Sequence, residues 1–272
     1  MSSVIFEPGL VSVSFRALAP KQIVDLAREC GLRGIEWGGD VHVPPGDLPR
    51  AREVRQMTAD AGLRTFAYGS YLRLGEDDAP AQFDAAIDVA LELNAPAIRV
   101  WAGRRGSAQA NAEYRRRVAD HAIDLADRAR DRAPARARAA NPDLMICYEY
   151  HADTLTDTDA SALDLLAATD HPNIATLWQP PHEMTIEQRE RSLRGVIDRL
   201  QHVHVFHWPR RGERAPLAEG AEGWKRYIRL LRSAFPRTTC PLLLEFVRDD
   251  DPDQLRADAA TLREIVDDKV TR

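Results

Sequence analysis

The stretch NIATLWQPPHEMTIEQRERSLRGVIDRLQHVHVFHW, residues 173–208, contains one complete structural unit of the chain. It opens with the β-rich run Ile174–Trp178 and closes with a second such run, His202–Phe206. Between the two runs, apolar residues recur with the period of a helix at Leu193, Val196, Ile197 and Leu200. A strand, a helix and a second strand in this order predict a parallel βαβ unit.

The same alternation runs through the whole chain. Eight β-rich runs are separated by segments of helical period: Leu10–Phe15, Gly34–Trp37, Arg64–Tyr68, Ala97–Trp101, Leu144–Glu149, Ile174–Trp178, His202–Phe206 and Leu242–Phe246. We therefore predict a single domain, residues 1–272, folded as a (β/α)8 TIM barrel. The Arg- and Ala-rich stretch Arg130–Asp143 is expected to be a solvated extension on the stability face. A doubly wound open sheet is the alternative, but no glycine-rich phosphate turn follows the first run.

The composition indicates a soluble, cytoplasmic protein that acts on a small molecule. Apolar residues make up 44% of the 272 residues and charged residues 29%, as in ordinary globular proteins. The sequence has no secretion signal and no run long enough to span a membrane. Cys30, Cys147 and Cys240 form no CxxC pair and are expected to be reduced core thiols. A net charge of −5 does not favour nucleic acid or an anionic membrane as a partner, and the oligomeric state, a homo-oligomer included, is left open.

Four polar side chains follow or lie within the last four predicted strands. They are Glu149, Gln179, His204 and Glu245. Because the carboxyl ends of barrel strands converge on one rim, we expect these side chains to lie close together. Oxygen ligands with one imidazole suit a divalent ion such as Mn²⁺, Mg²⁺ or Co²⁺, and Zn²⁺ is also compatible. The alternative is that they are isolated rim residues.

Further residues near the predicted rim are candidates for substrate binding. Glu36 ends the second strand and could reach a substrate hydroxyl, and Arg210 and Arg211 could grip a carboxylate or phosphate. Aromatic side chains at or just past strand ends are candidate pocket walls: Trp37, Tyr68, Trp101, Trp178 and Trp208. Rim packing and solvated loop charges are the alternatives. Residues with a weaker case are Arg99, a candidate pocket charge, and His42, His151 and His207.

Four segments carry a resemblance to a known family: Tyr148–His151, Trp178–His182, His202–Trp208 and Leu244–Phe246. They resemble the xylose isomerase-like TIM-barrel family of sugar phosphate isomerases and epimerases, and the likeness runs over essentially the whole chain. In the epimerases of that family a glutamate, an aspartate, a histidine and a glutamate after or on strands five to eight hold a metal ion. Glu149, His204 and Glu245 match this pattern, whereas Gln179 stands where the family has aspartate.

The resemblance also implies roles in catalysis. Glu149 and Glu245 would carry a proton on opposite sides of a substrate carbon, and His182 would contact a substrate oxygen. The leading hypothesis is therefore a metal-assisted isomerase or epimerase of a sugar or sugar derivative, which transfers a proton next to a carbonyl through an enediolate. A dehydratase of an inosose or sugar acid on the same site and a non-catalytic sugar-binding barrel are the alternatives. A DNA-repair endonuclease is disfavoured, since it would need further zinc ligands and a basic surface.

Overall fold

A computed structural model describes residues 4–132 and 144–268, and it forms a closed parallel barrel with the strands in the order β1 to β8. Strand β8 pairs with β1 and closes the sheet. The strands are β1 (Ile5–Val11), β2 (Gly34–Gly38), β3 (Arg64–Arg73), β4 (Ala97–Trp101), β5 (Met145–Tyr148), β6 (Ile174–Trp178), β7 (Leu200–Val205) and β8 (Thr239–Leu244). The predicted TIM barrel is confirmed.

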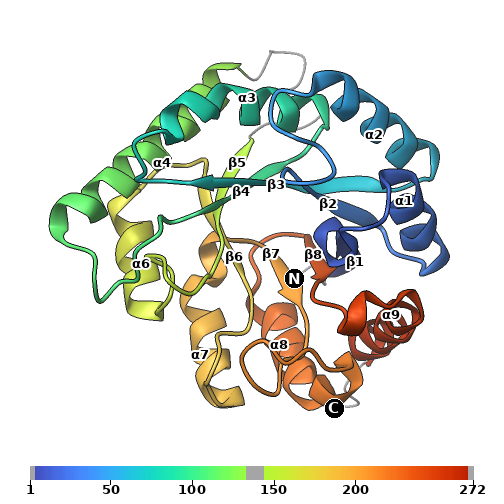
Figure 1. The fold of residues 1–272 in the computed structure, drawn as a ribbon. Coiled ribbons are helices and arrows are strands. Elements are labelled where there is room, and N and C mark those ends of the chain that lie inside the picture. Colours follow the sequence, from blue (N-terminus) through green and yellow to red (C-terminus); the bar gives the residue numbers. More distant parts are fainter. Residues whose placement is uncertain (1–3, 133–143, 269–272) are drawn as a thin grey trace.

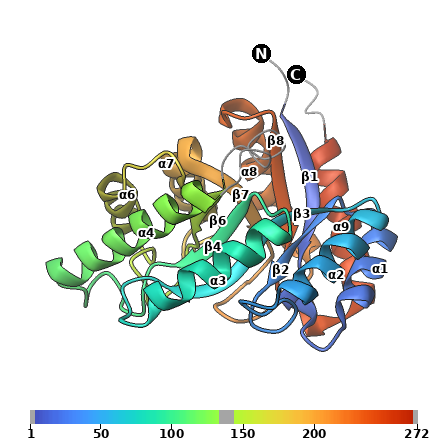
Figure 2. The same cartoon turned by 90° about the horizontal axis from the view of Figure 1, so that it is seen from above.

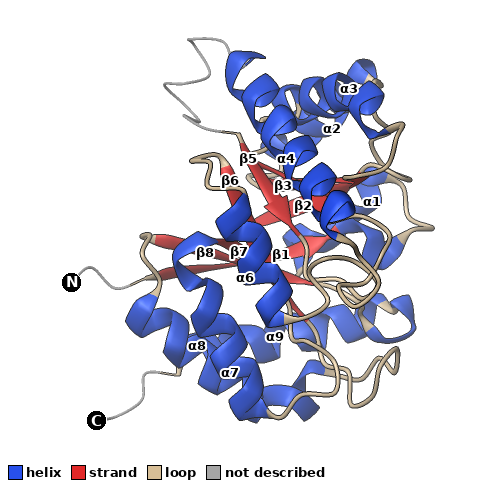
Figure 3. Ribbon diagram, turned by 90° about the vertical axis from the view of Figure 1, so that its left-hand side faces the viewer, coloured by secondary structure: helices blue, strands red, loops and turns tan. Residues whose placement is uncertain are grey.

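Helices follow the strands and surround the sheet, which lies at the centre of the molecule (Figures 1 and 3). The helices are α1 (Pro20–Glu29), α2 (Leu48–Asp60), α3 (Ala79–Glu92), α4 (Ala112–Arg132), α6 (Asp159–Ala168), α7 (Ile186–Val196), α8 (Ala221–Ala234) and α9 (Pro252–Asp267). Figure 2, turned by 90°, shows the same outer layer, with α3 and α4 on one side of the barrel and α9 on the other. Of the predicted extension Arg130–Asp143, α4 includes the first three residues, and residues 133–143 lie outside the described part of the chain.

The first strand lies earlier in the sequence than predicted. We expected Leu10–Phe15, but β1 is Ile5–Val11, and Ser12–Phe15 forms a 3₁₀ turn. Pro8 and Gly9 are poor strand formers and hid the strand in the sequence. Gly9 is needed there, because a Cβ atom at this position would lie 2.7 Å from the carbonyl oxygen of Gly34.

The described residues form three clusters of buried apolar side chains. Two are small: Ala67, Ala97, Cys147 and Ala175 form one, and Val11, Phe66 and Leu243 form the other. A larger apolar cluster lies between the sheet and the helices. The cysteines are free and buried, as predicted. Among the described residues, none of the helices has the length and apolar character needed to cross a membrane.

Candidate functional site

The alternation of side chains along each strand decides which residues face the inside of the barrel. Neighbours on a strand point to opposite faces, so Glu36 and Trp37 cannot face the same side, nor can Gln179 and Trp178. The structure brings together one inward-facing set at the carboxyl end of the barrel: Glu36, Arg99, Glu149, Gln179, His202, His204 and Glu245. All of these side chains are buried, with exposed fractions of 8% or less.

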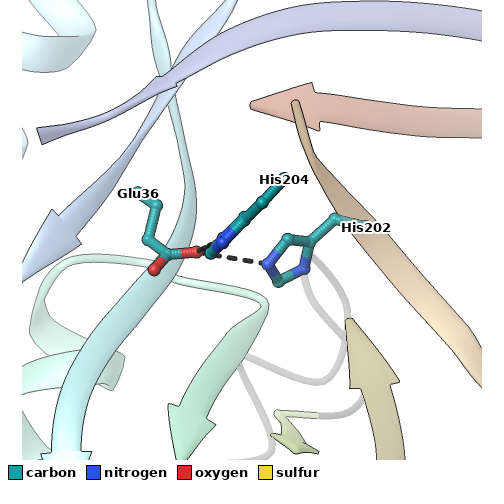
Figure 4. A group of neighbouring side chains, drawn as sticks. All are labelled: Glu36, His202 and His204. Atoms are coloured by element: carbon teal, nitrogen blue, oxygen red, sulfur yellow. Dashed lines mark hydrogen bonds and ion pairs between the residues drawn. The ribbon is translucent and has the colours of Figure 1, made fainter. Parts of the chain in front are cut away.

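At the bottom of this set lies a group formed by Glu36, His202 and His204. Figure 4 shows both imidazole rings, which come from β7, directed at one carboxylate of β2. The Nε2 atoms of His202 and His204 lie 3.2 and 3.1 Å from Oε2 of Glu36. Because a carboxylate only accepts hydrogen bonds, each imidazole donates from Nε2.

Arg99 connects this lower group with Glu149. Its Nε lies 2.8 Å from Oε1 of Glu36, and its NH1 forms an ion pair with Oε2 of Glu149. The indole N–H of Trp101 donates to the same Oε2 atom at 2.6 Å. Burial alone would raise the pKa of Glu149, but Arg99 together with the nearby imidazoles outweighs burial and holds that pKa below its ordinary value. Glu149 is therefore a carboxylate that stays ionised.

Above the lower group, three buried atoms have no hydrogen-bond partner among residues 4–132 and 144–268: Oε1 of Gln179, Nδ1 of His204 and Oε2 of Glu245. Nδ1 of His204 and Oε2 of Glu245 are only 3.1 Å apart but lie outside hydrogen-bonding geometry. The amide nitrogen of Gln179 donates to the carbonyl of Tyr150 at 2.5 Å, which leaves its oxygen free. Buried polar atoms without partners are costly, so this arrangement suits a ligand that they bind together.

The ligand atoms of Glu149, His204 and Glu245 have the spacing and charge that a divalent cation requires. Ligand atoms of Glu149, His204 and Glu245 all lie within 4.8 Å of one another. If both histidines are neutral, the carboxylates of Glu36, Glu149 and Glu245 exceed the single guanidinium of Arg99 by two negative charges, which one divalent ion balances. Oxygen and imidazole ligands are the types that Mg²⁺, Mn²⁺ and Zn²⁺ accept.

A cavity of about 260 Å³ lies beside this set at the carboxyl end of the barrel. Its lining includes Gln179, His151, His182 and Arg211. The ring of His151 packs 4.9 Å from Trp101, and His182 stacks on Trp208 at a centroid distance of 4.9 Å. Burial, with the nearby Arg211, lowers the pKa of His182 below its ordinary value, so this ring is neutral at pH 7.

Other residues predicted to bind substrate lie elsewhere. Trp37, Tyr68 and Trp178 are fully buried on the outer face of the sheet, which corrects the expectation that they are pocket walls. Trp178 packs against Trp224 and Tyr227, and its indole nitrogen donates to Ser192. The physical reason is the two-residue period of a strand. Trp178 directly precedes Gln179 and must point to the opposite face.

Of the charged and histidine residues predicted near the site, some line the cavity and others do not. Arg211 lines the cavity at 3.7 Å from Asp153, whereas Arg210 is exposed in the same turn and does not line it. His42 forms hydrogen bonds with Ser12 and Leu18 in the core. His207 lines a separate cavity of about 130 Å³ between α7 and α8.

Sequence reasoning missed two residues near the site, Tyr71 and Arg73. Strand β3 continues to Arg73, well beyond the predicted end at Tyr68. The ring of Tyr71 packs against Trp101 and below the guanidinium of Arg99, and Arg73 covers the other part of Trp101. The polar and aromatic residues that follow Tyr68 were the only sign of these two residues in the sequence. Strand β3 continues through this segment because its pairing with β4 is irregular between Gly69 and Arg73.

Comparison with known proteins agrees with this fold. Residues 24–265 match the sequence profile of the xylose isomerase-like TIM barrel. The chain belongs to this family. Over 177 residues it is 27% identical to a 3-dehydroshikimate dehydratase of Bacillus anthracis, an alignment that covers 61% of this chain and 59% of that relative. The alignment thus spans less than two thirds of the dehydratase.

Solved structures show the same architecture. The probable 3-dehydroshikimate dehydratase of petrobactin synthesis from Bacillus anthracis superposes with a TM-score of 0.74 at 22% identity, covering 94% of this chain and 98% of the other. The 3-keto-D-glucoside 4-epimerase of E. coli gives 0.68 at 15% identity, with 96% and 99% covered. A family barrel from Mycobacterium smegmatis, with a TM-score of 0.66 at 14% identity and 98% and 97% covered, was crystallised with magnesium. Solved structures with the fold of this chain thus include a probable dehydratase and an epimerase.

Proposed function

We propose that this chain is a metal-dependent dehydratase, which removes water from a polyhydroxylated carbonyl compound such as a sugar acid or an inosose. Glu149, Gln179, His204 and Glu245 would hold the ion. Ligand atoms of Glu149, His204 and Glu245 lie within 4.8 Å of one another, and the amide group of Gln179 lies beside Glu149. When bound, a divalent cation supplies Lewis-acid stabilisation of negative charge at the substrate's carbonyl oxygen.

We prefer elimination because of the hydrogen bonds that the Glu149 carboxylate accepts. Its Oε2 accepts from Arg99 and Trp101, and its Oε1 lies 3.4 Å from the amide nitrogen of Gln179. A carboxylate held ionised in this way is a poor proton carrier. An epimerase needs a proton carrier on each face of the substrate carbon, whereas an elimination can use a single group on one face. The site therefore favours elimination.

His151 is the candidate for that single group. Its Nδ1 lies 2.6 Å from the carbonyl oxygen of Ala152 and must donate to it, so Nε2 carries the lone pair that a base needs. The ring is partly exposed and lines the cavity next to Gln179. These features support a general base that meets substrate at the barrel mouth.

The proposed reaction balances with His151 alone as proton carrier. His151 takes the proton from the carbon next to the carbonyl, and the C–H electron pair forms an enolate. The enolate then forms a carbon–carbon double bond while the C–O bond on the next carbon breaks. The proton held by His151 passes to the departing hydroxide, which gives water and an α,β-unsaturated carbonyl compound. His182 and Arg211, which line the same cavity, would hold substrate oxygens or a carboxylate.

An epimerase or isomerase is the second candidate. It is favoured by Glu245, whose Oε2 atom has no hydrogen-bond partner in the described part of the chain and could take up a substrate proton. In that reaction Glu245 and His151 would act on opposite faces of one carbon. The 3-keto-D-glucoside 4-epimerase of E. coli has the same fold, which shows that this fold can support epimerisation.

Incubation with substrate candidates in deuterated water tests the proposal. The Mn²⁺-loaded protein would be mixed with a panel of sugar acids, inososes, cyclic hydroxy-ketones and ketoses, followed by proton NMR after removal of the ion. We expect one substrate to give a vinylic proton signal together with loss of water. An epimer that carries deuterium would instead support the second candidate, and no change with any compound of the panel would contradict both.

Gln179→Asp is expected to bind a divalent cation more tightly than the parent. A carboxylate binds a hard cation more strongly than an amide oxygen does, and the substitution adds one negative charge. Calorimetric titration of Mn²⁺ into chelator-treated protein should give an affinity higher by about tenfold or more, in the range of other coordination-sphere effects. Equal affinities would mean that Gln179 does not bind the ion.

Cation binding is expected to tighten as pH rises. Burial opposes a charge on His204, but the carboxylates of Glu245 and Glu36 outweigh it and raise the pKa of His204 to about 10. Below that pH the ring holds a second proton, which a cation at Nδ1 must replace. The Mn²⁺ affinity should therefore rise by about tenfold per pH unit between pH 6.5 and 8.5. A pH-independent affinity in calorimetry would contradict binding through His204.

A further inference from the structure

The two nitrogens of the His204 ring have different neighbours. Nε2 lies 3.1 Å from Oε2 of Glu36, and Nδ1 lies 3.1 Å from Oε2 of Glu245. Figure 4 shows the edge of the ring aimed at the Glu36 carboxylate. Glu36 has no exposed surface, so it cannot reach a substrate in this arrangement.

We propose that Glu36 is a positioning residue, which fixes the His204 ring so that Nδ1 is presented beside Glu245 to a divalent cation. The proposal rests on the metal site of the proposed function. It assigns Glu36 a role different from the substrate contact expected from the sequence.

The carboxylate fixes the ring because of what it can accept. An ionised carboxylate has no proton to donate, so the imidazole must donate from Nε2, and only Nδ1 is left for a cation. Carboxylates that accept from the second nitrogen of a metal-binding histidine are a general means of orienting the ring. His202 donates to the same oxygen, and its contact is separate from the one between Glu36 and His204.

The guanidinium of Arg99 pairs with the carboxylate of Glu36. Its Nε atom lies 2.8 Å from Oε1 of Glu36, at the end of the carboxylate that the histidines do not use. The same guanidinium pairs with Glu149, so one cation ties together the carboxylates of β2 and β5. An Arg charge costs several kcal/mol to bury unless it is paired, and here both partners are carboxylates.

Glu36, His202 and His204 also have the spacing of a metal site of their own. The charge of Arg99 disfavours a second ion there. Glu36 and Arg99 neutralise each other at 2.8 Å, which leaves two neutral imidazoles to hold a cation in a fully buried place. One ion per chain, at the Glu245 side of His204, is therefore expected.

Glu36→Gln tests the proposal through metal affinity and through the histidine ring itself. The amide keeps one acceptor oxygen, but it loses the negative charge and replaces the oxygen that faces Arg99 with an NH₂ group, so it holds the His204 ring more weakly than the carboxylate does. We expect Mn²⁺ affinity to fall by about 10- to 100-fold, the usual effect of losing such a partner. In ¹⁵N-histidine NMR of the metal-free protein, the downfield Nε2 proton of His204 should shift upfield or be lost to exchange.

Three further variants keep the result interpretable. Glu36→Asp retains the charge next to Arg99 and should fold even if the glutamine variant does not; its shorter reach should still weaken Mn²⁺ binding. His202→Gln leaves the contact between Glu36 and His204 in place and should keep affinity within about threefold of the parent. Asp258→Asn removes a buried carboxylate remote from the site, which accepts from Leu217 and Gln254, and should leave affinity unchanged.

Specific outcomes would overturn the proposal. Unchanged Mn²⁺ affinity in folded Glu36→Gln or Glu36→Asp would show that Glu36 does not position His204. Equal losses in Glu36→Gln and His202→Gln, with two ions per parent chain, would make the lower group an ion site instead. If the parent binds no divalent cation, the metal part of the proposed function fails. An unchanged Nε2 proton signal in Glu36→Gln would then overturn the contact between Glu36 and His204 as well.

Discussion

Glu245→Gln is expected to lower turnover by at least about 10³-fold and to abolish retention of Mn²⁺ through dialysis, because a bound metal is worth several kcal/mol of barrier. Oε2 of Glu245 is buried, has no hydrogen-bond partner and lies 3.1 Å from Nδ1 of His204. The substitution removes one of the two excess negative charges that a divalent ion balances. Steady-state kinetics and metal analysis of the dialysed protein would measure both effects.

Glu264→Gln is the matched control for this experiment. Glu264 lies on the exposed face of α9, so the same change of charge there should leave metal content and turnover at parental values. A Glu245→Gln protein that retains both metal and near-parental turnover would remove Glu245 from the site.

His151→Asn is expected to lower kcat by about 10²- to 10⁴-fold, the usual range for loss of a general base. Mn²⁺ affinity should stay within about threefold of the parent, because His151 lies on the cavity side of Trp101 and donates to a backbone carbonyl rather than to a candidate ligand. The separation of the two readouts distinguishes a base from a metal ligand.

His171→Asn provides the control for this prediction. His171 precedes β6 at the opposite end of the barrel, where it accepts from the backbone of Asn173 and contacts Asp127. Its substitution should change stability but not kcat. If His151→Asn keeps the parental kcat, the proton passes through another group, and Glu245 becomes the first candidate.

The buried ion pairs of the site could not be read from the sequence. Glu36, Arg99 and His204 come from β2, β4 and β7, and their contacts depend on the closure of the barrel rather than on sequence spacing. The sequence could place Glu149, Gln179 and Glu245 just past apolar runs, since the position of a strand end is local information. The ion pair between Arg99 and Glu149 could be found only in the three-dimensional structure. This ion pair is the reason why we propose elimination rather than epimerisation.

The errors in the sequence-based fold and pocket have local causes. Pro8 and Gly9 concealed the start of β1, because strand propensity says nothing about the close approach of Gly9 to β2. Trp37 and Trp178 were expected at the pocket because they end apolar runs. Each tryptophan is adjacent in sequence to an inward-facing residue, Glu36 or Gln179, and must therefore point to the outer face of the sheet. The alternation of side chains along a strand could have shown this from the sequence alone.

In the proposed function, Glu149, Gln179, His204 and Glu245 bind one divalent cation at the mouth of the barrel. Anomalous diffraction from a crystal of the Mn²⁺-loaded protein, collected on both sides of the manganese absorption edge, tests it most directly. We expect one anomalous peak per chain, about 2.0–2.3 Å from Nδ1 of His204 and from oxygen atoms of the other three residues. A peak among Glu36, His202 and His204, or no peak in protein that turns over its substrate, would contradict it.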